Sequence, residues 1–208
     1  MPPLNHAVLS ASSAYRWLEC PPSALATADI PDETTIYAQE GSAAHEMAEY
    51  KIRWHLGAKD LAPPNVGNFN AEEIDRYTDS YAYYATDKIE TIRKICPDAI
   101  VMVEQVEKAK LACNDPIVLI EQKLDFSRWV PEGFGTGDCV IVADGTLSVI
   151  DFKYGKGVEV LAENNPQMML YALGALNLYG YLYDIKTVKT AIVQPRLDNI
   201  SEWEISVD

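Results

Sequence analysis

The stretch "GTGDCVIVADGTLSVIDFKYG", residues 135–155, decides the fold of this chain. Its two halves are β-rich, and Asp144-Gly145 between them is typical of a two-residue hairpin turn. A turn at this point sets Asp138 directly opposite Asp151 on the paired strands. Side chains that face each other in an antiparallel pair have Cβ atoms about 4.5–5.5 Å apart. We therefore expect two carboxylates to meet on one face of this hairpin.

The surroundings of these carboxylates are apolar. Valines and a leucine occupy one face of the predicted hairpin, and Cys139 and two isoleucines occupy the other, a pattern typical of strands covered on both sides. Carboxylates buried there repel each other and lose hydration, so a bound cation or a shared proton is expected. Lys153 lies on the same face, because side chains alternate along a strand. Mg²⁺ or Mn²⁺ is the simplest cation for Asp138 and Asp151, since both ions prefer oxygen ligands.

Two other interpretations of this pair stay open. The carboxylates can lie at a solvated strand end, where Lys153 would form a surface salt bridge of little energetic weight. Paired acids are also the catalytic groups of glycosidases. The lysine beside the pair and the lack of an aromatic platform for a sugar count against a glycosidase.

Length and composition indicate an ordinary globular protein. The chain has 208 residues, 48% hydrophobic and 23% charged, which suits one good-sized domain or a domain with a helical appendage. No apolar run has the length of a membrane span, and the N-terminus lacks the pattern of a signal peptide. We therefore expect a cytoplasmic protein without membrane contacts. No CxxC pair occurs, so buried, reduced thiols are expected at Cys20, Cys96, Cys113 and Cys139.

The charge balance is an argument against a polyanionic partner. The formal net charge is −14 and the sequence pI is about 4.6, whereas phosphate contacts require Lys and Arg. Bound metal ions would offset part of this charge locally. Weak intrinsic affinity for DNA, a partner protein, or a ring-shaped oligomer that encloses DNA would account for the rest.

Helical patterns fill the first half of the chain and β-rich runs the second. This order predicts a mixed α/β fold, with an N-terminal helical region at 1–98 and a sheet core at 99–208 that together form one structural domain. The predicted elements are a helix at 10–20 ended by Pro21-Pro22, a helix from Ser42 to Gly57, a loop at 58–69, a helix from Asn70 to Pro97, strands within 99–109, 116–126, 137–143 and 147–154, a helix after Asn165, and strands within 188–195 and 201–207.

Asp138, followed on the next strand by Asp151-Phe152-Lys153, resembles the core of the PD-(D/E)XK nucleases. Gly137 stands where the first motif of that superfamily usually has proline. The stretch "EGSAAHEMAE" is similar to the G-x-x-x-H helix of the RecB-like and lambda-exonuclease-like branch, and "NPQMMLYALG" is similar to its Q-x-x-x-Y helix. The resemblance implies a restriction-endonuclease-like core, in which helices flank a mixed central β-sheet.

The opening of the chain extends this resemblance. "LSASSAYRWLECPPS" and "PDETTIYAQEGSAAHEMAE" resemble a family of phage and prophage proteins that is filed as a domain of unknown function among the RecB-like exonucleases. The similarity covers almost the whole chain, and its four motifs occur in the right order. It implies a phage or prophage protein that acts in the cytoplasm of a bacterial host.

The resemblance assigns a role to each matching residue. His45, Asp138 and Asp151 would be metal ligands, and the main-chain carbonyl of Phe152 would complete the ligand set. Lys153 would orient or activate the attacking water and stabilise charge in the transition state.

Other residues are accessory candidates. Gln167 and Tyr171 share a helix face and would hold the DNA strand, although core packing competes as the role of Tyr171. Arg16 would contact a DNA end. Glu49 shares a face with His45, and "HEMAE" is not a zinc-protease motif, because Glu49 stands where that motif needs His. Glu121 can point toward the site from a neighbouring strand or lie in solvent.

Some members of this branch carry an iron–sulfur cluster held by four cysteines. Cys20 matches the position of the first, but no cysteine follows Cys139, so we expect no cluster in this chain. The last residues are a predicted strand, which leaves open a longer protein. Tyr77, Tyr81 and Tyr84 have helical spacing, which favours core packing over stacking on bases.

These observations together predict a metal-dependent DNA nuclease, and specifically an exonuclease of phage recombination or DNA processing. It would hydrolyse phosphodiester bonds with water activated by Mg²⁺ or Mn²⁺. A phage recombination protein or further copies of the chain are the expected partners besides DNA. The alternative is a non-catalytic DNA-binding or assembly subunit that retains the nuclease fold.

Overall fold

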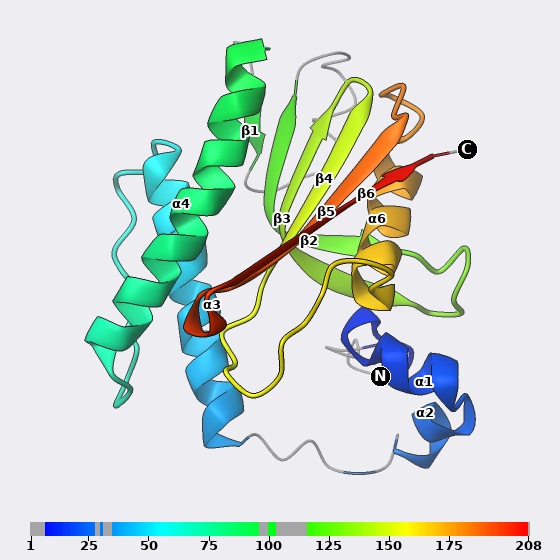
Figure 1. Cartoon of the computed structure of the whole chain (residues 1–208), viewed down its shortest axis with the longest axis horizontal. Coiled ribbons are helices and arrows are strands. Elements are labelled where there is room, and N and C mark those ends of the chain that lie inside the picture. The colour runs from blue at the N-terminus through cyan, green and yellow to red at the C-terminus, as the bar shows by residue number, and fades with distance from the viewer. Residues whose placement is uncertain (1–6, 28–29, 31–34, 96–99, 103–115, 208) are drawn as a thin grey trace.

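The computed structural model describes residues 7–27, 30, 35–95, 100–102 and 116–207. Within them the fold is the predicted mixed α/β arrangement, with helices first, then a mixed sheet with a helix packed on it (Figure 1). The elements are η1 (Ala11–Ser13), α1 (Ala14–Glu19), α2 (Pro22–Ala26), α3 (Ile36–His55), α4 (Ala71–Ile95), β1 (Ile100–Met102), β2 (Ile117–Asp125), β3 (Phe134–Ala143), β4 (Thr146–Phe152), α6 (Pro166–Tyr179), β5 (Thr187–Gln194), η2 (Pro195–Leu197) and β6 (Asn199–Ser206).

The strands form one sheet in the order β1-β2-β3-β4-β5-β6. Strands β2, β3 and β4 are antiparallel neighbours, and β5 pairs parallel to β4 after the crossover through α6. The hairpin predicted at Asp144-Gly145 is present: Ala143 pairs with Thr146, and the register continues as expected to Cys139 and Ile150.

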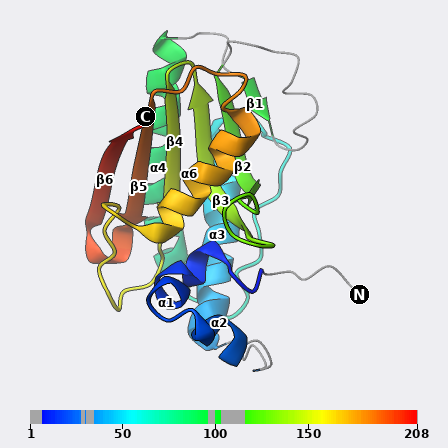
Figure 2. The same ribbon diagram turned by 90° about the vertical axis from the view of Figure 1, so that its right-hand side faces the viewer.

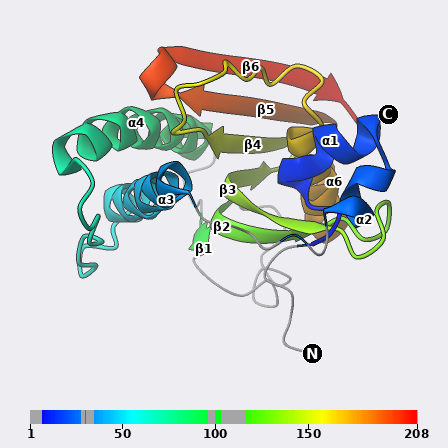
Figure 3. The same cartoon turned by 90° about the horizontal axis from the view of Figure 1, so that it is seen from below.

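Helices cover both faces of the sheet. Helix α6, with the N-terminal helices beside it, lies on one face, and α3 and α4 lie on the other (Figures 2 and 3). Alternate residues of β3 therefore enter different cores: Val140 and Val142 pack toward α6, whereas Cys139 and Ile141 pack toward α3 and α4. The prediction that both faces of the hairpin are covered is confirmed.

Two helix boundaries differ from the sequence prediction. Helix α3 begins at Ile36 rather than near Ser42, because Thr35 caps it: its Oγ1 accepts a hydrogen bond from the Ala38 N–H at 3.1 Å. A further short helix, α2, begins at Pro22, where a stop was predicted. The N–H groups in the first turn of a helix have no acceptor within the helix, so the missing N–H of proline costs nothing there. Proline can therefore begin a helix as readily as end one.

Other local predictions are confirmed. The Asn70 side chain accepts a hydrogen bond from the Glu73 N–H at 3.2 Å just before α4. The Asn165 side chain caps α6 by accepting from the N–H groups of Gln167 and Met168. Trp17 is buried, and its indole N–H donates to the Ser10 carbonyl at 2.9 Å.

Some predictions fall outside the described residues. These include Cys96, Cys113, most of the strand expected within 99–109, and the boundary between 98 and 99. Of the cysteines that are described, Cys139 is buried and Cys20 is exposed, and neither is in a disulfide. No helix in the described ranges is long and apolar enough to cross a membrane.

Candidate metal centre

Asp138 lies where the ladder between β3 and β4 ends. The register of main-chain pairs stops at Cys139 and Ile150. One step further on, Asp138 Oδ2 accepts a hydrogen bond from the Phe152 N–H at 2.6 Å. This bond fixes the carboxylate at the end of the hairpin and leaves its other oxygen, Oδ1, facing the helix α3.

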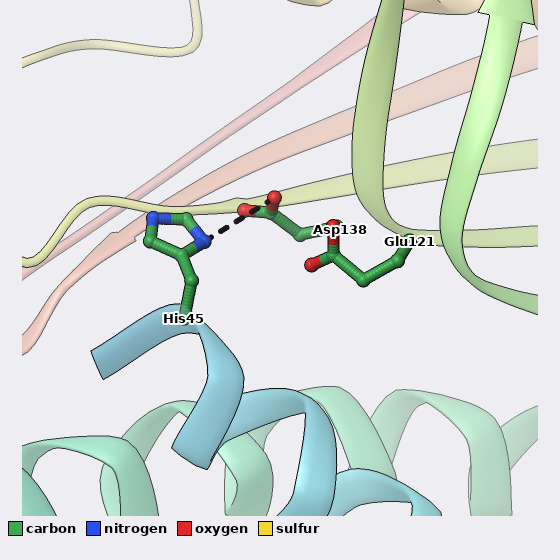
Figure 4. Close-up of side chains that lie close together, drawn as sticks. All are labelled: His45, Glu121 and Asp138. Carbon is green, nitrogen blue, oxygen red and sulfur yellow. Dashed lines mark ion pairs between the residues drawn. The ribbon is translucent and has the colours of Figure 1, made fainter. Parts of the chain in front are cut away.

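Glu121 lies opposite Asp138 on the other neighbouring strand. Ile120 pairs with Cys139 and Gln122 pairs with Gly137, so Glu121 is at the intervening position. Its φ is 53°, in the left-handed region that residues other than glycine rarely adopt. Such backbone strain costs about 1–3 kcal/mol and is found most often at functional sites. The unusual backbone coincides with a carboxylate that approaches Asp138 (Figure 4).

His45 reaches the same point from α3. Its Nδ1 is 3.5 Å from Asp138 Oδ1 (Figure 4). Its ring also contacts the ring of Phe152, with centroids 5.1 Å apart. The helix can approach the sheet closely because the inward residues on either side of the histidine are small, Ala44 and Ala48, both fully buried. The imidazole is 36% exposed, so it remains accessible from solvent.

The three side chains form a group that can hold a metal ion. One ligand atom from each of His45, Glu121 and Asp138 lies within 4.8 Å of the others. Ligand atoms on opposite sides of an ion, each about 2.0–2.2 Å from it, are at most about 4.4 Å apart, so binding requires only a small contraction. Carboxylates suit Mg²⁺ and Mn²⁺ and imidazole suits transition metals, so the donor set fits Mn²⁺ well.

A second polar cluster lies beside the first, toward α6. Asp151 is 2% exposed, and the Lys153 ammonium lies 2.8 Å from its Oδ2. The Gln167 amide bridges them, because its Nε2 donates to Asp151 Oδ1 at 3.1 Å and its Oε1 accepts from Lys153 at 3.0 Å. Gln167 Nε2 is also 3.2 Å from the hydroxyl of Tyr171, its neighbour one helical turn along α6.

The electrostatics of the first cluster favour a bound cation. Burial opposes a charged imidazole, but the charge and contact of Asp138, with help from Asp151 and Glu121, raise the pKa of His45 to about 9. Burial and then the charge of Asp138 raise the pKa of Glu121 to about 8. A divalent ion in this cluster would relieve the same carboxylate repulsion that raises these two pKa values.

The two hairpin aspartates differ in their acidity. Burial alone would raise the pKa of both carboxyl groups. At Asp138 the charge and contact of His45 and the Phe152 N–H outweigh burial, and its pKa is lowered. At Asp151 burial dominates, the charge of Asp138 adds to it, and the pKa is raised despite Lys153. Lys153 in turn has a raised pKa, because Asp151 outweighs the burial that disfavours its charge.

The structure separates the sequence candidates into three groups. His45, Asp138 and Glu121 lie together, and Glu121 was a weaker candidate because its strained backbone leaves no trace in the sequence. The second cluster unites Asp151, Lys153, Gln167 and Tyr171. The remaining accessory residues lie elsewhere: Glu49 pairs with Arg53 at 2.6 Å, and Arg16 is exposed on α1.

The aromatic candidates are mostly structural. Tyr81 is buried and stacks on Phe152 with ring centroids 4.6 Å apart, as the core interpretation predicted. Tyr84 is half-buried, and its hydroxyl bonds to Glu202. Tyr171 is both a core residue and a member of the second cluster, since it is 5% exposed and hydrogen-bonded to Gln167. Its ring lies 2.7 Å from where a Cβ on Gly135 would be, so only glycine fits there.

Open hollows surround the clusters. One of about 310 Å³ is lined by His45, Phe152 and Lys153, and an adjoining one of about 680 Å³ extends past Lys153 toward Gln167 and Tyr15 of α1. Lys153 lines both. A solute can therefore reach the ammonium and the imidazole from the same side of the molecule.

A protein-family model matches residues 6–107 and 103–208, nearly the entire chain. The chain belongs to the DUF2800 family. That family is described as a protein of unknown function, in agreement with the family of unknown function that the opening motifs resemble. Among solved structures, "Crystal structure of SSO0001" is similar to this DUF2800 protein at 15% identity over 93% of this chain and 78% of that chain, with a TM-score of 0.25. A TM-score this low supports no inference about function.

Proposed function

We propose that this DUF2800 protein is a metal-dependent deoxyribonuclease that hydrolyses phosphodiester bonds with metal-activated water. The observation that carries the proposal is the arrangement of two neighbouring clusters, each built around one aspartate of the hairpin. His45, Glu121 and Asp138 can hold a divalent ion, and the Asp151–Lys153 pair stands directly beside them. This pairing of a metal site with a half-buried ammonium is what the PD-(D/E)XK resemblance of the sequence implies.

Each cluster has a distinct part in the proposed reaction. A divalent ion in the first cluster would acidify a bound water and neutralise charge on the phosphate. The Lys153 ammonium, held by Asp151 and Gln167, is aimed at a fixed point and can stabilise charge that develops on a phosphoryl oxygen. Its orientation is set before substrate arrives, so little reorganisation is needed during the reaction.

The proposed substrate is DNA, and the acidic surface limits how tightly it can bind. Half of the Lys and Arg side chains that the structure describes are already paired with carboxylates, such as Lys51 with Asp75 and Asp79. Lys156, beside the site, has no ion-pair partner among the described residues, and Arg16 is similarly free. Because the formal net charge is −14, we propose weak intrinsic affinity for DNA, supplemented by a partner protein or by further copies of this chain.

The test is cleavage of end-labelled linear DNA and of closed circular DNA, with Mn²⁺, with Mg²⁺ and with EDTA. We expect metal-dependent loss of the linear substrate alone, which is the behaviour of an exonuclease. Asp138→Asn should abolish it. Glu204→Gln, which changes an exposed carboxylate on β6 paired with Lys189, is the matched control and should cut normally.

The outcomes separate the alternatives. Cutting of closed circles would replace the exonuclease by an endonuclease. Metal binding without any cutting would favour the non-catalytic DNA-binding or assembly subunit. Absence of both metal binding and cutting would overturn the proposal.

A further inference from the structure

Arg196 in η2 is the centre of an ion-pair network beside the metal cluster. Its side chain is 6% exposed, and its guanidinium contacts Glu40 of α3 at 3.3 Å and Glu73 of α4 at 2.8 Å. The guanidinium also lies over the ring of Tyr154, 4.5 Å from the centroid. Tyr154 directly follows Lys153. One side chain thus contacts both helices of the outer layer and the segment that leaves the candidate site.

Gln194, two residues before Arg196, contacts the same segment that follows Lys153. Gln194 is 2% exposed, and its Oε1 accepts from the Val160 N–H at 2.7 Å while its Nε2 donates to the Val158 carbonyl at 3.0 Å. Asn199 donates to the same Oε1 at 2.8 Å. The connection between β5 and β6 therefore fixes the chain after Lys153 at two places.

We propose that Arg196 is a positioning residue for the metal cluster, acting through Glu40 on the helix that carries His45. The inference rests on the proposed metal site. His45 is five residues beyond Glu40 on α3. A sliding or rotation of α3 by a fraction of a turn would carry the imidazole away from Asp138. The buried guanidinium opposes such movement because its planar fork holds two carboxylates in fixed directions.

A second ion-pair network provides the natural control. Lys51, 9% exposed, lies on α3 six residues beyond His45 and contacts Asp75 and Asp79 of α4 at 2.8 and 2.6 Å. It ties the same two helices together but contacts neither η2 nor the segment after Lys153 in the described structure. A purely structural role for Arg196 predicts that the two networks behave alike. A positioning role predicts that they differ.

The two partners of Arg196 sharpen the test further. Glu40 lies on the helix of His45, whereas Glu73 lies on α4, which contributes no residue to the cluster. Glu40→Gln and Glu73→Gln each remove one carboxylate from the same guanidinium, and both substitutions keep the shape of the side chain. Both should lower thermal stability, but only Glu40→Gln should disturb the position of His45.

The experiment measures Mn²⁺ affinity by calorimetry in the full chain, together with the melting temperature of the metal-free protein. Loss of a residue that orients a ligand typically weakens metal binding by about 10–100-fold. We expect a loss of this size for Arg196→Gln and a loss of about tenfold for Glu40→Gln. Glu73→Gln and Lys51→Met should bind Mn²⁺ as the unaltered protein does, even where they melt earlier.

A metal-free measurement keeps this inference separate from the proposed function. The His45 and Phe152 rings, with centroids 5.1 Å apart, should give a proton nuclear Overhauser effect without any metal. We expect Glu40→Gln to weaken it and Glu73→Gln to preserve it. Equal affinities and equal Overhauser effects in these two variants would overturn the positioning role. A normal Overhauser pattern with no Mn²⁺ binding in the unaltered protein would instead overturn the proposed metal site.

Discussion

The two polar clusters of the site share one hairpin, but they hold their charges differently. In the first, His45, Glu121 and Asp138 face one another with few hydrogen bonds, and the imidazole is partly open to solvent. In the second, Asp151 is closed in by Lys153 and Gln167, and every charge has a partner. The hairpin aspartate on β3 thus lies in a group whose charges are incompletely paired, whereas the one on β4 lies in a group whose charges are paired.

This difference suggests a division of labour. The second cluster is already organised without an ion, since the Lys153 ammonium neutralises Asp151 at 2.8 Å and Gln167 bridges the two. An open cluster with raised pKa values gains from a divalent cation, which removes the need for its protons. The comparison predicts that substitutions in the first cluster affect metal binding, whereas substitutions in the second affect chemistry alone.

The largest expected effect follows from Asp138→Asn. This change removes one of the three metal ligands and should lower Mn²⁺ affinity by at least the roughly 100-fold that losses around metal sites reach. The unaltered protein at a hundred times its dissociation constant gains about 2.7 kcal/mol from the ion, and the variant should gain almost none. Thermal melting with and without Mn²⁺ measures this. Metal stabilisation that survives in the variant would contradict the ligand role.

Lys153→Met should have the opposite effect to Asp138→Asn: it should impair DNA cleavage but leave Mn²⁺ binding intact. The pKa of Asp151, already raised by burial, would rise further in the variant, because the opposing lysine charge is lost. We expect DNA cleavage to fall by roughly 100- to 1,000-fold, which is typical for loss of a group that stabilises transition-state charge. Mn²⁺ affinity should stay close to that of the unaltered protein. Calorimetry measures the Mn²⁺ affinity and single-turnover cleavage measures the rate, both on one preparation. A parallel loss of Mn²⁺ affinity would show that the two clusters form a single metal site.

Much of this arrangement follows from the sequence for a local reason. Turn chemistry at Asp144-Gly145 fixes the register of β3 and β4 as far as Cys139 and Ile150. The ladder ends there, so Asp138 and Asp151 lie near each other but join separate clusters. The cap at Asn165 likewise fixes where α6 begins, and so places Gln167. In each case the deciding residues are within a few positions of what they determine.

Contacts between distant segments were the ones that sequence patterns could not supply. Arg196 meets Glu40 and Glu73 across more than a hundred residues, and no local pattern marks it as buried. The sequence left two positions open for Glu121, in the site or in solvent, since the alternation of side chains along a strand does not reveal a left-handed φ. The early start of α3 at Ile36 depends on a cap by Thr35 in a stretch without clear periodicity.

The pH dependence of stability should report on the titratable groups of the first cluster. His45 and Glu121 both have folded pKa values raised above the ordinary ones, to about 9 and about 8. The folded, metal-free protein thus binds protons more tightly than the unfolded chain, so its stability should fall as pH rises from about 6 to 9. Mn²⁺ replaces those protons, so metal stabilisation should grow over the same range. Melting curves across this pH range measure both trends, and Asp138→Asn should flatten them. A metal effect independent of pH would show that the cluster carries no displaceable protons.

The smallest predicted effect concerns the strained residue of the open cluster. Glu121→Gly relieves a left-handed φ that costs about 1–3 kcal/mol, against about 0.5–1 kcal/mol for the added freedom of glycine in the unfolded chain. The unfolding free energy of the metal-free protein should therefore rise by about 1 kcal/mol. Mn²⁺ affinity should fall about tenfold or more, because a ligand is lost. Denaturant titration and calorimetry measure the two quantities.

Glu132→Gly is the control for that trade-off. Glu132 has the same residue type and nearly the same backbone, with φ at 56°, but it lies in the exposed connection between β2 and β3. Glycine there should raise stability by a similar amount, about 1 kcal/mol, without any change in Mn²⁺ affinity. If both variants gain stability and only Glu121→Gly loses metal, the strain at Glu121 is the cost of aiming a carboxylate at Asp138. Equal metal affinity in the two would mean that the strain at Glu121 serves the turn of the strand and not the ion, leaving His45 and Asp138 as the ligand pair.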